Sequence, residues 1–295
     1  MNKAERLTDN SAALMHERAA TAARRSPAGR AKTSLIDNPV GRSIIQALAM
    51  AAFFGAWELG VRAGLVSSFM VGSPSAIFEA LLRSARSGML FVDTGYTLFA
   101  AILGFVIGTV AGSTAGLALW YSPFVAKVIE PFIVSINSVP KIAFAPIVVL
   151  WFGTGLLSKV ALAVSLTAII ALVAAYEAAK DTDIDLQALV LTLGATKTDV
   201  FYKVVVPSAL PYIIATFRIN VGFGLVGAVV GEFISSEKGL GHMIFTASSL
   251  YDLNTVWAGL LSLMAIGFAL YFAIDRIERA LLPWKAQSSA STLRV

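Results

Sequence analysis

The sequence predicts an all-α polytopic membrane protein with about six transmembrane helices, from its composition, its hydropathy and its long apolar runs. Of the 295 residues, 57% are hydrophobic and only 14% are charged, whereas soluble domains have about 45–50% apolar and about 25% charged residues. The mean hydropathy is +0.76. The apolar runs are nearly uncharged and lack the alternation of period two that a membrane β-barrel requires. A soluble enzyme and a barrel are therefore both excluded.

The apolar runs are long enough to cross a bilayer. Such a helix needs about 20 mostly apolar residues, because the hydrocarbon core is about 30 Å thick. Six segments qualify: 44–61, 92–120, 128–152, 158–177, 208–233 and 254–275. Between the first two, Ser73 precedes Pro74, a pair that favours a helix start. A helix beginning there carries Ile77, Leu81 and Leu82 on one face, and we expect it to lie in the interface because it is too short to span.

The ends of the chain are polar. Residues 1–42 lack both aromatic side chains and the apolar core of a secretory signal. We expect a disordered cytoplasmic tail there, and the lack of aromatics argues against a nucleic-acid-binding arm. A membrane domain of residues 43–285 and a second cytoplasmic tail of residues 286–295 follow. This orientation places sixteen Lys and Arg in inner segments and five in outer segments, in agreement with the positive-inside rule.

The sequence offers little metal, redox or nucleotide chemistry. It has no Cys, which excludes disulfides and thiolate sites. Its two histidines are His16 in the tail and His242, expected at the surface of an outer loop, so neither a histidine metal site nor an intramembrane hydrolase is favoured. The chain contains no G-x-x-x-x-G-K-[ST] phosphate loop, and hence no ATP site of that kind.

Two glycine patterns are expected to serve helix packing. Gly104, Gly108, Gly112 and Gly116 recur every four residues and so form one ridge where another backbone can approach, a substrate groove being the alternative. The segment 222–227 spells the dinucleotide fingerprint G-x-G-x-x-G. It lies inside an apolar span rather than between a strand and a helix, so we interpret it as small-residue packing.

The segment 180–207 is a loop with its own helical signals. Asp183 and Asp185 stand where a helix N-terminus favours anions, and Gly194 stands where a left-handed residue ends a helix. A second short helix is expected from about Thr198 until Pro207 stops it. The first helix carries an apolar stripe of Leu186, Leu189, Val190 and Leu193. Periodicity alone leaves open whether this stripe is buried against the protein's own spans or in a partner's groove.

This loop resembles the characteristic cytoplasmic loop of ATP-binding-cassette (ABC) importer permeases, E-A-A-x3-G-x9-I-x-L-P. With the glycine of that pattern at Gly194, its proline falls on Pro207, and Val204 and Val206 occupy the positions of Ile and Leu. The sequence departs from the pattern at Ala188, where the family has its glutamate. That substitution removes whatever polar anchoring the glutamate provides.

Further segments are similar, in content and order, to the nitrate, sulfonate and taurine branch of these permeases. They include Gly72-Ser-Pro-Ser-Ala, Leu103-Gly-Phe, Asn137-Ser-Val-Pro-Lys-Ile-Ala-Phe-Ala-Pro, Leu150-Trp-Phe-Gly-Thr-Gly, Gly227-Ala-Val-Val-Gly-Glu-Phe, Gly239-Leu-Gly and Leu281-Leu-Pro-Trp. The resemblance covers about residues 44–285. It favours a small anionic solute such as nitrate, a sulfonate or taurine, with a cationic thiamine precursor or an aromatic carboxylate as alternatives.

The resemblance implies a type I ABC importer permease fold in the bacterial inner membrane, with both termini in the cytoplasm. It implies a homodimer, two ABC ATPase subunits and a periplasmic or lipid-anchored binding protein. The chain would be a transport subunit without enzymatic activity, cofactor or metal, since ATP and Mg bind to the ATPase. The residues implied to couple to the ATPase are Asp185, Leu186, Ala188, Leu189, Val190, Leu193, Gly194, Ala195 and Pro207.

Polar groups within the spans are candidates for the translocation pathway, because they are expensive in lipid. The candidates are Asn137, Ser138, Lys141, Arg218, Asn220 and Glu232. Pro140 and Pro146 are expected to break the third span. For the charged candidates alternatives remain open. Lys141 attracts an anion, pairs with Glu130 or snorkels; Arg218 meets headgroups or a dimer partner; and Glu232 contacts the binding protein or another helix. An ion-coupled secondary transporter is the rival function, although the spans hold almost no Asp.

Overall fold

The computed structural model describes residues 39–283, and every regular element within that range is helical. Five helices are long and apolar enough to cross a membrane, and the number is six if a bent helix pair counts as one span. The long helices are α2 (Pro39–Arg62), α5 (Met89–Tyr121), α8 (Leu156–Lys180), α11 (Val206–Ile234) and α13 (Leu253–Leu281). The prediction of an all-α protein with about six spans is confirmed.

The chain divides into two units, with the boundary between Leu59 and Gly60. The first unit consists, in its described part, of most of α2, whose rings of Phe53, Phe54 and Trp57 contact one another at centroid distances of 5.4 to 6.3 Å. Helix α2 begins at Pro39, so residues 39–42, assigned to the tail from sequence, belong to the first helix. The rest of the two predicted tails lies outside the described residues, as do the last positions of the predicted membrane domain after residue 283.

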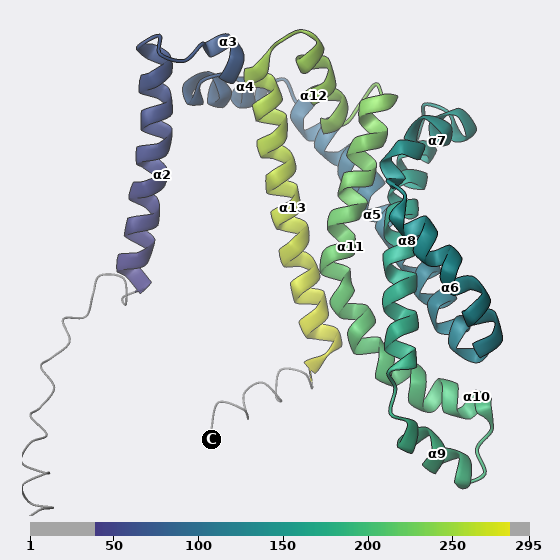
Figure 1. Ribbon diagram of the computed structural model, residues 1–295. Helices are drawn as coiled ribbons and strands as arrows, with labels where there is room; N and C mark the ends of the chain where they lie inside the picture. Colours follow the sequence, from purple (N-terminus) through teal and green to yellow (C-terminus); the bar gives the residue numbers. More distant parts are fainter. Residues whose placement is uncertain (1–38, 284–295) are drawn as a thin grey trace, which may run out of the picture. The chain divides into compact units, whose positions relative to one another are not determined.

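The second unit has α5, α8 and α11 at its centre (Figure 1). Helix α8 presents Ala163 to glycines of both neighbours, since a Cβ placed on Gly104 or on Gly227 would collide with it. Further along α5, a Cβ on Gly112 would collide with the backbone of Ala168. The glycine ridge of α5 is therefore a packing surface, as predicted, and so are Gly224 and Gly227 of α11, whereas a Cβ on Gly222 would meet nothing within 4 Å.

Helix α13 packs against α11 and against two shorter helices, α4 (Pro74–Arg86) and α12 (Leu240–Ser249). The Ser73 side chain caps α4, as predicted, by accepting a hydrogen bond from Ala76 N at 3.4 Å. The predicted apolar face is only partly correct, because Ile77 is buried whereas Leu82 is 37% exposed. A further short helix, α3 (Ser68–Val71), precedes α4.

The third span is broken, as Pro140 predicts. Helix α6 (Pro123–Ser138) and the segment formed by the 3-10 turn η1 (Lys141–Phe144) and α7 (Ala145–Phe152) meet at an angle of 84°. Val139 at the break is extended, with φ −80° and ψ 133°. A residue before proline avoids the helical region because the proline ring collides with its backbone, and this restriction ends α6.

The 180–207 loop contains α9 (Ile184–Thr192), α10 (Lys197–Val200) and the π turn η2 (Phe201–Val205), which leads directly into α11. The prediction that Pro207 stops the second helix is wrong, because helical structure continues from Lys197 to Ile234. In the π turn, Val206 N donates to Phe201 O, five residues back. This wider turn accommodates the proline ring that would otherwise collide with the preceding turn. Figure 1 shows α9 and α10 at one end of this unit, the α9 end, and α4 and α12 at the other, the α12 end.

Candidate functional site

Helix α9 is delimited by side-chain and backbone features that the sequence predicted. Asp183 Oδ1 accepts hydrogen bonds from Asp185 N at 2.8 Å and from Leu186 N at 3.3 Å, which caps the first turn. At the other end Gly194 has φ +86°, and Ala195 N donates to Val190 O at 3.3 Å. The left-handed glycine therefore ends α9 and turns the chain toward α10.

The apolar stripe of α9 is divided between an inner and an outer surface. Val190 packs against a cluster of buried residues that includes Ala179 of α8 and Val200 of α10. By contrast, Leu189 is 55% exposed and Leu193 is 79% exposed. Leu186 and Ala188 are also exposed, as is Pro207, whereas Ala195 is half-buried. The loop is thus held to its own spans through Val190 and leaves an apolar surface on the other side of α9.

Helix α10 has a complete N-terminal cap. Thr196 N donates to Asp199 Oδ2 at 3.0 Å, and Asp199 N donates to Thr196 Oγ1 at 3.2 Å, so each residue satisfies the backbone of the other. Lys203 Nζ adds an ion pair with Asp199 Oδ1 at 2.7 Å. This cap fixes the start of the continuous helix that becomes α11.

A cation and three aromatic rings attach α10 to the end of α5. Lys197 Nζ donates to Tyr121 O at 2.6 Å and lies 5.7 Å from the ring centroid of Trp120. The Trp120 ring stacks on Phe201 at 5.6 Å, and Tyr121 Oη and Thr198 Oγ1 share a hydrogen bond at 2.5 Å. Sequence reasoning missed this cluster. The signal available in the sequence was the Trp120-Tyr121 pair at the end of a predicted span, because Trp and Tyr are enriched at the membrane–water interface.

At the α12 end, a carboxylate is buried between helices. Glu232 of α11 is 1% exposed, and its Oε2 accepts hydrogen bonds from Thr97 Oγ1 at 2.9 Å and from Gly241 N at 2.8 Å. Its Oε1 has no hydrogen-bond partner among the described residues. Glu232 was expected to contact either the binding protein or another helix. The structure shows the contact with other helices, namely α5 and α12.

The start of α12 is bound to α5 by two further hydrogen bonds. Gly239 N donates to Asp93 Oδ1 at 2.8 Å, and Leu240 N donates to Thr97 Oγ1 at 2.9 Å. Gly239 has φ +107°, and a Cβ there would collide with the Glu232 carboxylate. Asp93 and Thr97 were not singled out from sequence, since these partners in α12 lie more than 140 positions away.

Lys159, one of the five cations counted in the outer segments, is fully buried at the start of α8. Its ammonium group donates to the carbonyl oxygens of Thr154 and Ser235. These carbonyls belong to the α7–α8 connection and to the residue that follows α11, respectively. Lys159 therefore joins two chain segments.

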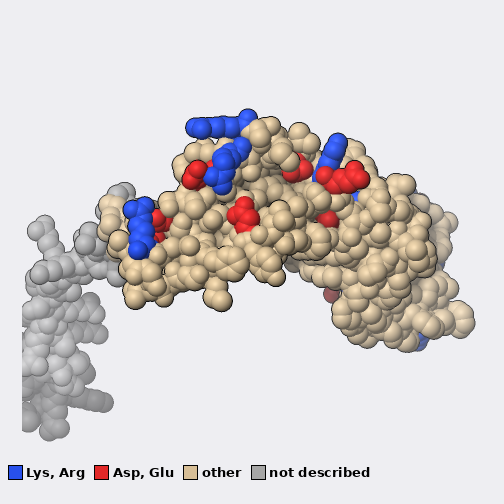
Figure 2. Space-filling view, turned by 90° about the horizontal axis from the view of Figure 1, so that it is seen from above, with Lys and Arg blue, Asp and Glu red and all other residues tan. Residues whose placement is uncertain are grey.

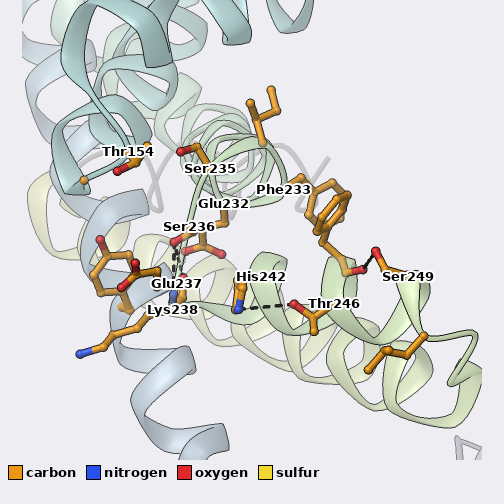
Figure 3. Close-up of a pocket in the computed structure, with 15 residues that line it drawn as sticks. Thr154, Glu232, Phe233, Ser235, Ser236, Glu237, Lys238, His242, Thr246 and Ser249 are labelled. Carbon is orange, nitrogen blue, oxygen red and sulfur yellow. Dashed lines mark hydrogen bonds between the residues drawn. The ribbon is translucent and has the colours of Figure 1, made fainter.

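A polar pocket of about 750 Å³ lies beside this network (Figure 3). Its labelled lining residues are Thr154, Glu232, Phe233, Ser235, Ser236, Glu237, Lys238, His242, Thr246 and Ser249. His242 is half-buried on α12 and pairs with Thr246 at 3.4 Å, so the expectation of an outer-loop surface residue is wrong. Figure 2 shows that both acidic and basic side chains lie at the α12 end.

Two predicted pathway residues make contacts between helices of the same chain. Asn220 is fully buried, and its Nδ2 donates to Thr109 Oγ1 at 3.1 Å and to Thr167 O at 3.2 Å. Arg218 forms ion pairs with Asp275 at 2.6 Å and Glu278 at 2.7 Å on α13. A pathway role for either residue stays a prediction.

The other predicted pathway residues lie at the break of the third span. Asn137 and Ser138 are exposed at the end of α6, and Lys141 is half-buried at the start of η1. Lys141 Nζ donates to Asn137 Oδ1 at 3.1 Å, so its hydrogen-bond partner is Asn137 rather than Glu130. The break thus brings an amide and an ammonium group together. Within residues 39–283 no three His, Asp or Glu side chains converge as metal ligands.

Comparison with known proteins places this geometry in a family. A family model described as the binding-protein-dependent transport system inner membrane component matches residues 104–283. The chain is 33% identical over 229 residues to the formylaminopyrimidine transport permease protein ThiX of Halalkalibacterium halodurans, covering 78% of this chain and 91% of that protein.

Two more distant relatives are named as permeases for other solutes. The riboflavin transport system permease protein RibX of Chloroflexus aurantiacus is 30% identical, covering 78% of this chain and 86% of that protein. The taurine transport system permease protein TauC of Escherichia coli is 27% identical, with coverage of 84% and 93%.

Among solved structures, a chain of the MetNI methionine ABC transporter, in an inward facing conformation, is similar in fold. The TM-score is 0.59 at 20% identity, and the match covers 66% of this chain and 97% of that one. This likeness supports the type I importer fold, and the family match decides against an ion-coupled secondary transporter. The chain belongs to the binding-protein-dependent inner membrane component family and is the multi-pass permease component of an ABC importer, with ATP hydrolysis and solute capture assigned to partner proteins.

Proposed function

We propose that this permease carries a small organic solute containing a nitrogen heterocycle into the cytoplasm. The observation that supports this substrate class is the 33% identity to the formylaminopyrimidine permease, spread over 91% of that protein. The riboflavin permease, also named for a nitrogen heterocycle, is 30% identical. The taurine permease has a lower sequence identity of 27%.

The break in the third span suits such a solute. Asn137 and Ser138 are exposed there, and amide and hydroxyl groups can pair with both the donors and the acceptors of a heterocycle. Backbone that departs from a helix at membrane depth is tolerated where it lines a cavity or is buried in protein. We therefore place the pathway along this break, formed jointly with a second copy of the chain.

A sulfonate or another small anion is the second candidate. It is favoured by Lys141, the cation that lies next to Asn137 at the same break. An ammonium group attracts a sulfonate as a point charge, and its bond to the neutral Asn137 leaves its charge uncompensated. This candidate predicts that removal of the Lys141 charge abolishes uptake, whereas the heterocycle proposal predicts that uptake persists.

The proposed assembly has two copies of this chain and two ATPase subunits, with the α9 end in the cytoplasm. Helix α9 would be the coupling helix, because it presents Leu189 and Leu193 away from its own spans. The proposed contact residues are Asp185, Leu186, Ala188, Leu189, Leu193 and Gly194. The half-buried Val190 and Ala195 would support them, and Pro207 would position the loop from the start of α11.

The test begins with purification of the tagged chain from its native membranes together with its binding protein and ATPase. Calorimetry then measures binding of a formylaminopyrimidine, riboflavin and taurine to that binding protein. Uptake of the ligand that binds is measured in proteoliposomes with ATP inside, for the native chain and for Lys141→Gln. Binding of taurine alone, with loss of uptake in Lys141→Gln, would replace the heterocycle proposal by the sulfonate candidate.

A further inference from the structure

A groove of about 520 Å³ at the α9 end is lined by three lysines from three different elements. Lys127 comes from α6, Lys180 from the end of α8 and Lys197 from α10. All three side chains are exposed. Three positively charged residues that are far apart in the chain thus line one concave surface.

The positive charge of this groove exceeds its negative charge. Glu130 is the acidic residue that lines it, and Glu177 lies 3.9 Å from Lys180 with both side chains more than half exposed. An exposed pair of this kind contributes little and leaves the lysine available to another anion. Lys127 has no ion pair with any residue that the structure describes.

Aromatic rings hold two of the lysines at the groove. Lys180 Nζ lies 5.9 Å from the ring centroid of Tyr176, and Lys197 Nζ lies 5.7 Å from that of Trp120. Both rings line the groove and are half-buried. Cation–π contacts hold an ammonium group without neutralising it, so both lysines keep their positive charge at the edge of the groove.

Apolar side chains also line the groove, and the adjoining exposed surface of α6 is apolar. Its lining includes Leu119 and Ala126. Beside it on α6, Phe124 is 78% exposed and Val128 is 50% exposed. An occupant that matches this surface carries an anionic group next to long apolar chains, which describes a phospholipid and not a free phosphate ion.

We propose that this groove binds the headgroup of an anionic phospholipid of the cytoplasmic leaflet, with the acyl chains lying along α6. The inference rests on the proposed orientation, in which the α9 end faces the cytoplasm. Basic pockets between spanning helices on that side of a membrane are typical headgroup sites. A phosphate held by Lys127, Lys180 and Lys197 links the start of α6, the end of α8 and the start of α10. It would therefore stabilise the two elements, α8 and α10, between which α9 lies in the chain.

The experiment uses the full chain, purified with its ATPase in mild detergent and exposed to nanodiscs of phosphatidylcholine with or without one quarter phosphatidylglycerol. Native mass spectrometry counts the phospholipids that remain after detergent washing. The test variant is Lys127→Gln/Lys180→Gln, because Lys197 also supports Tyr121. The matched control is Arg83→Gln/Arg86→Gln, which removes two cations from α4 at the opposite end.

We expect the native chain and the α4 control to retain phosphatidylglycerol, and the Lys127→Gln/Lys180→Gln variant to retain about thirtyfold less, since each of the two lysines near an anionic surface contributes about 1 kcal/mol. Lys127→Arg/Lys180→Arg should restore retention, which separates charge from folding. Equal retention by the test variant, equal retention of phosphatidylcholine, or displacement by millimolar inorganic phosphate would each overturn the proposal. Because lipid retention requires no substrate, these outcomes are independent of the uptake assay that tests the proposed function.

Discussion

Lys197 donates a hydrogen bond from Nζ to the main-chain carbonyl of Tyr121 at 2.6 Å, and this bond connects the 180–207 loop to the end of α5. The same ammonium lies 5.1 Å from the Tyr121 ring centroid. A displacement of the loop is therefore passed to α5 as well as to α11. Helix α5 in turn packs closely on α8 through its glycines, so the two helices are expected to move together.

Replacing Lys197 should weaken this connection. Lys197→Ala removes one charge-assisted hydrogen bond and its cation–π contacts, which together contribute about 1–3 kcal/mol. We expect ATP-driven uptake to fall several-fold while ATP hydrolysis by the assembled complex continues. The measurement is solute uptake per ATP hydrolysed in proteoliposomes, with Arg86→Ala as the control. An unchanged ratio would show that the connection is not needed for coupling.

Gly194 should tolerate asparagine but not a β-branched residue. Its φ of +86° is strained for any side chain, although a Cβ at this position would meet nothing within 4 Å. Left-handed geometry costs about 1–2 kcal/mol for most residues and less for asparagine. We expect Gly194→Val to lose ATPase coupling and Gly194→Asn to keep it. Transport that survives in Gly194→Val would contradict the view that α9 needs this fixed end.

The glycines of the spans should differ in their tolerance of alanine. At Gly112 a Cβ would collide with the backbone of Ala168, whereas at Gly222 it would meet nothing within 4 Å. We expect Gly112→Ala to lower the free energy of unfolding by about 1–3 kcal/mol and Gly222→Ala to leave it unchanged or slightly raised. Thermal unfolding of the purified variants in one detergent measures the difference. Equal unfolding temperatures would exclude close packing of α5 on α8.

Glutamine should replace Glu232 with little loss. Oε2 accepts both hydrogen bonds, from Thr97 and Gly241 N, and Oε1 accepts none among the described residues. A glutamine carbonyl can keep both bonds and removes a buried charge. We therefore expect Glu232→Gln to match the native thermal stability. Glu232→Ala should be less stable by about 2–4 kcal/mol, because it leaves two buried donors unsatisfied.

A loss of stability in Glu232→Gln as large as that in Glu232→Ala would contradict this account of the α12 end. It would show that the carboxylate charge itself is required there. Thr97→Val provides an independent control, since it removes the donor to Glu232 and the acceptor for Leu240 N while preserving the shape of the side chain. We expect its stability to resemble that of Glu232→Ala.

The sequence alone determined the features of this protein that depend on residues close together in the chain. The number of spans follows from the lengths of its apolar runs, and the break in the third span follows from Pro140. The caps at Ser73 and Asp183 and the left-handed Gly194 follow from the local chemistry of helix ends. In each case the physical cause acts within a few residues of the chain.

Only the tertiary structure decided which distant groups meet. Arg218 pairs with Glu278 across 60 positions, and Glu232 meets Thr97 across 135. Lys159 is buried, and its ammonium donates to two carbonyl groups from separate segments of the chain. Such pairs depend on the rotation and depth of whole helices, which the close approach of α5, α8 and α11 sets through their glycines. A residue type at one position carries no information about the helix face that it will oppose.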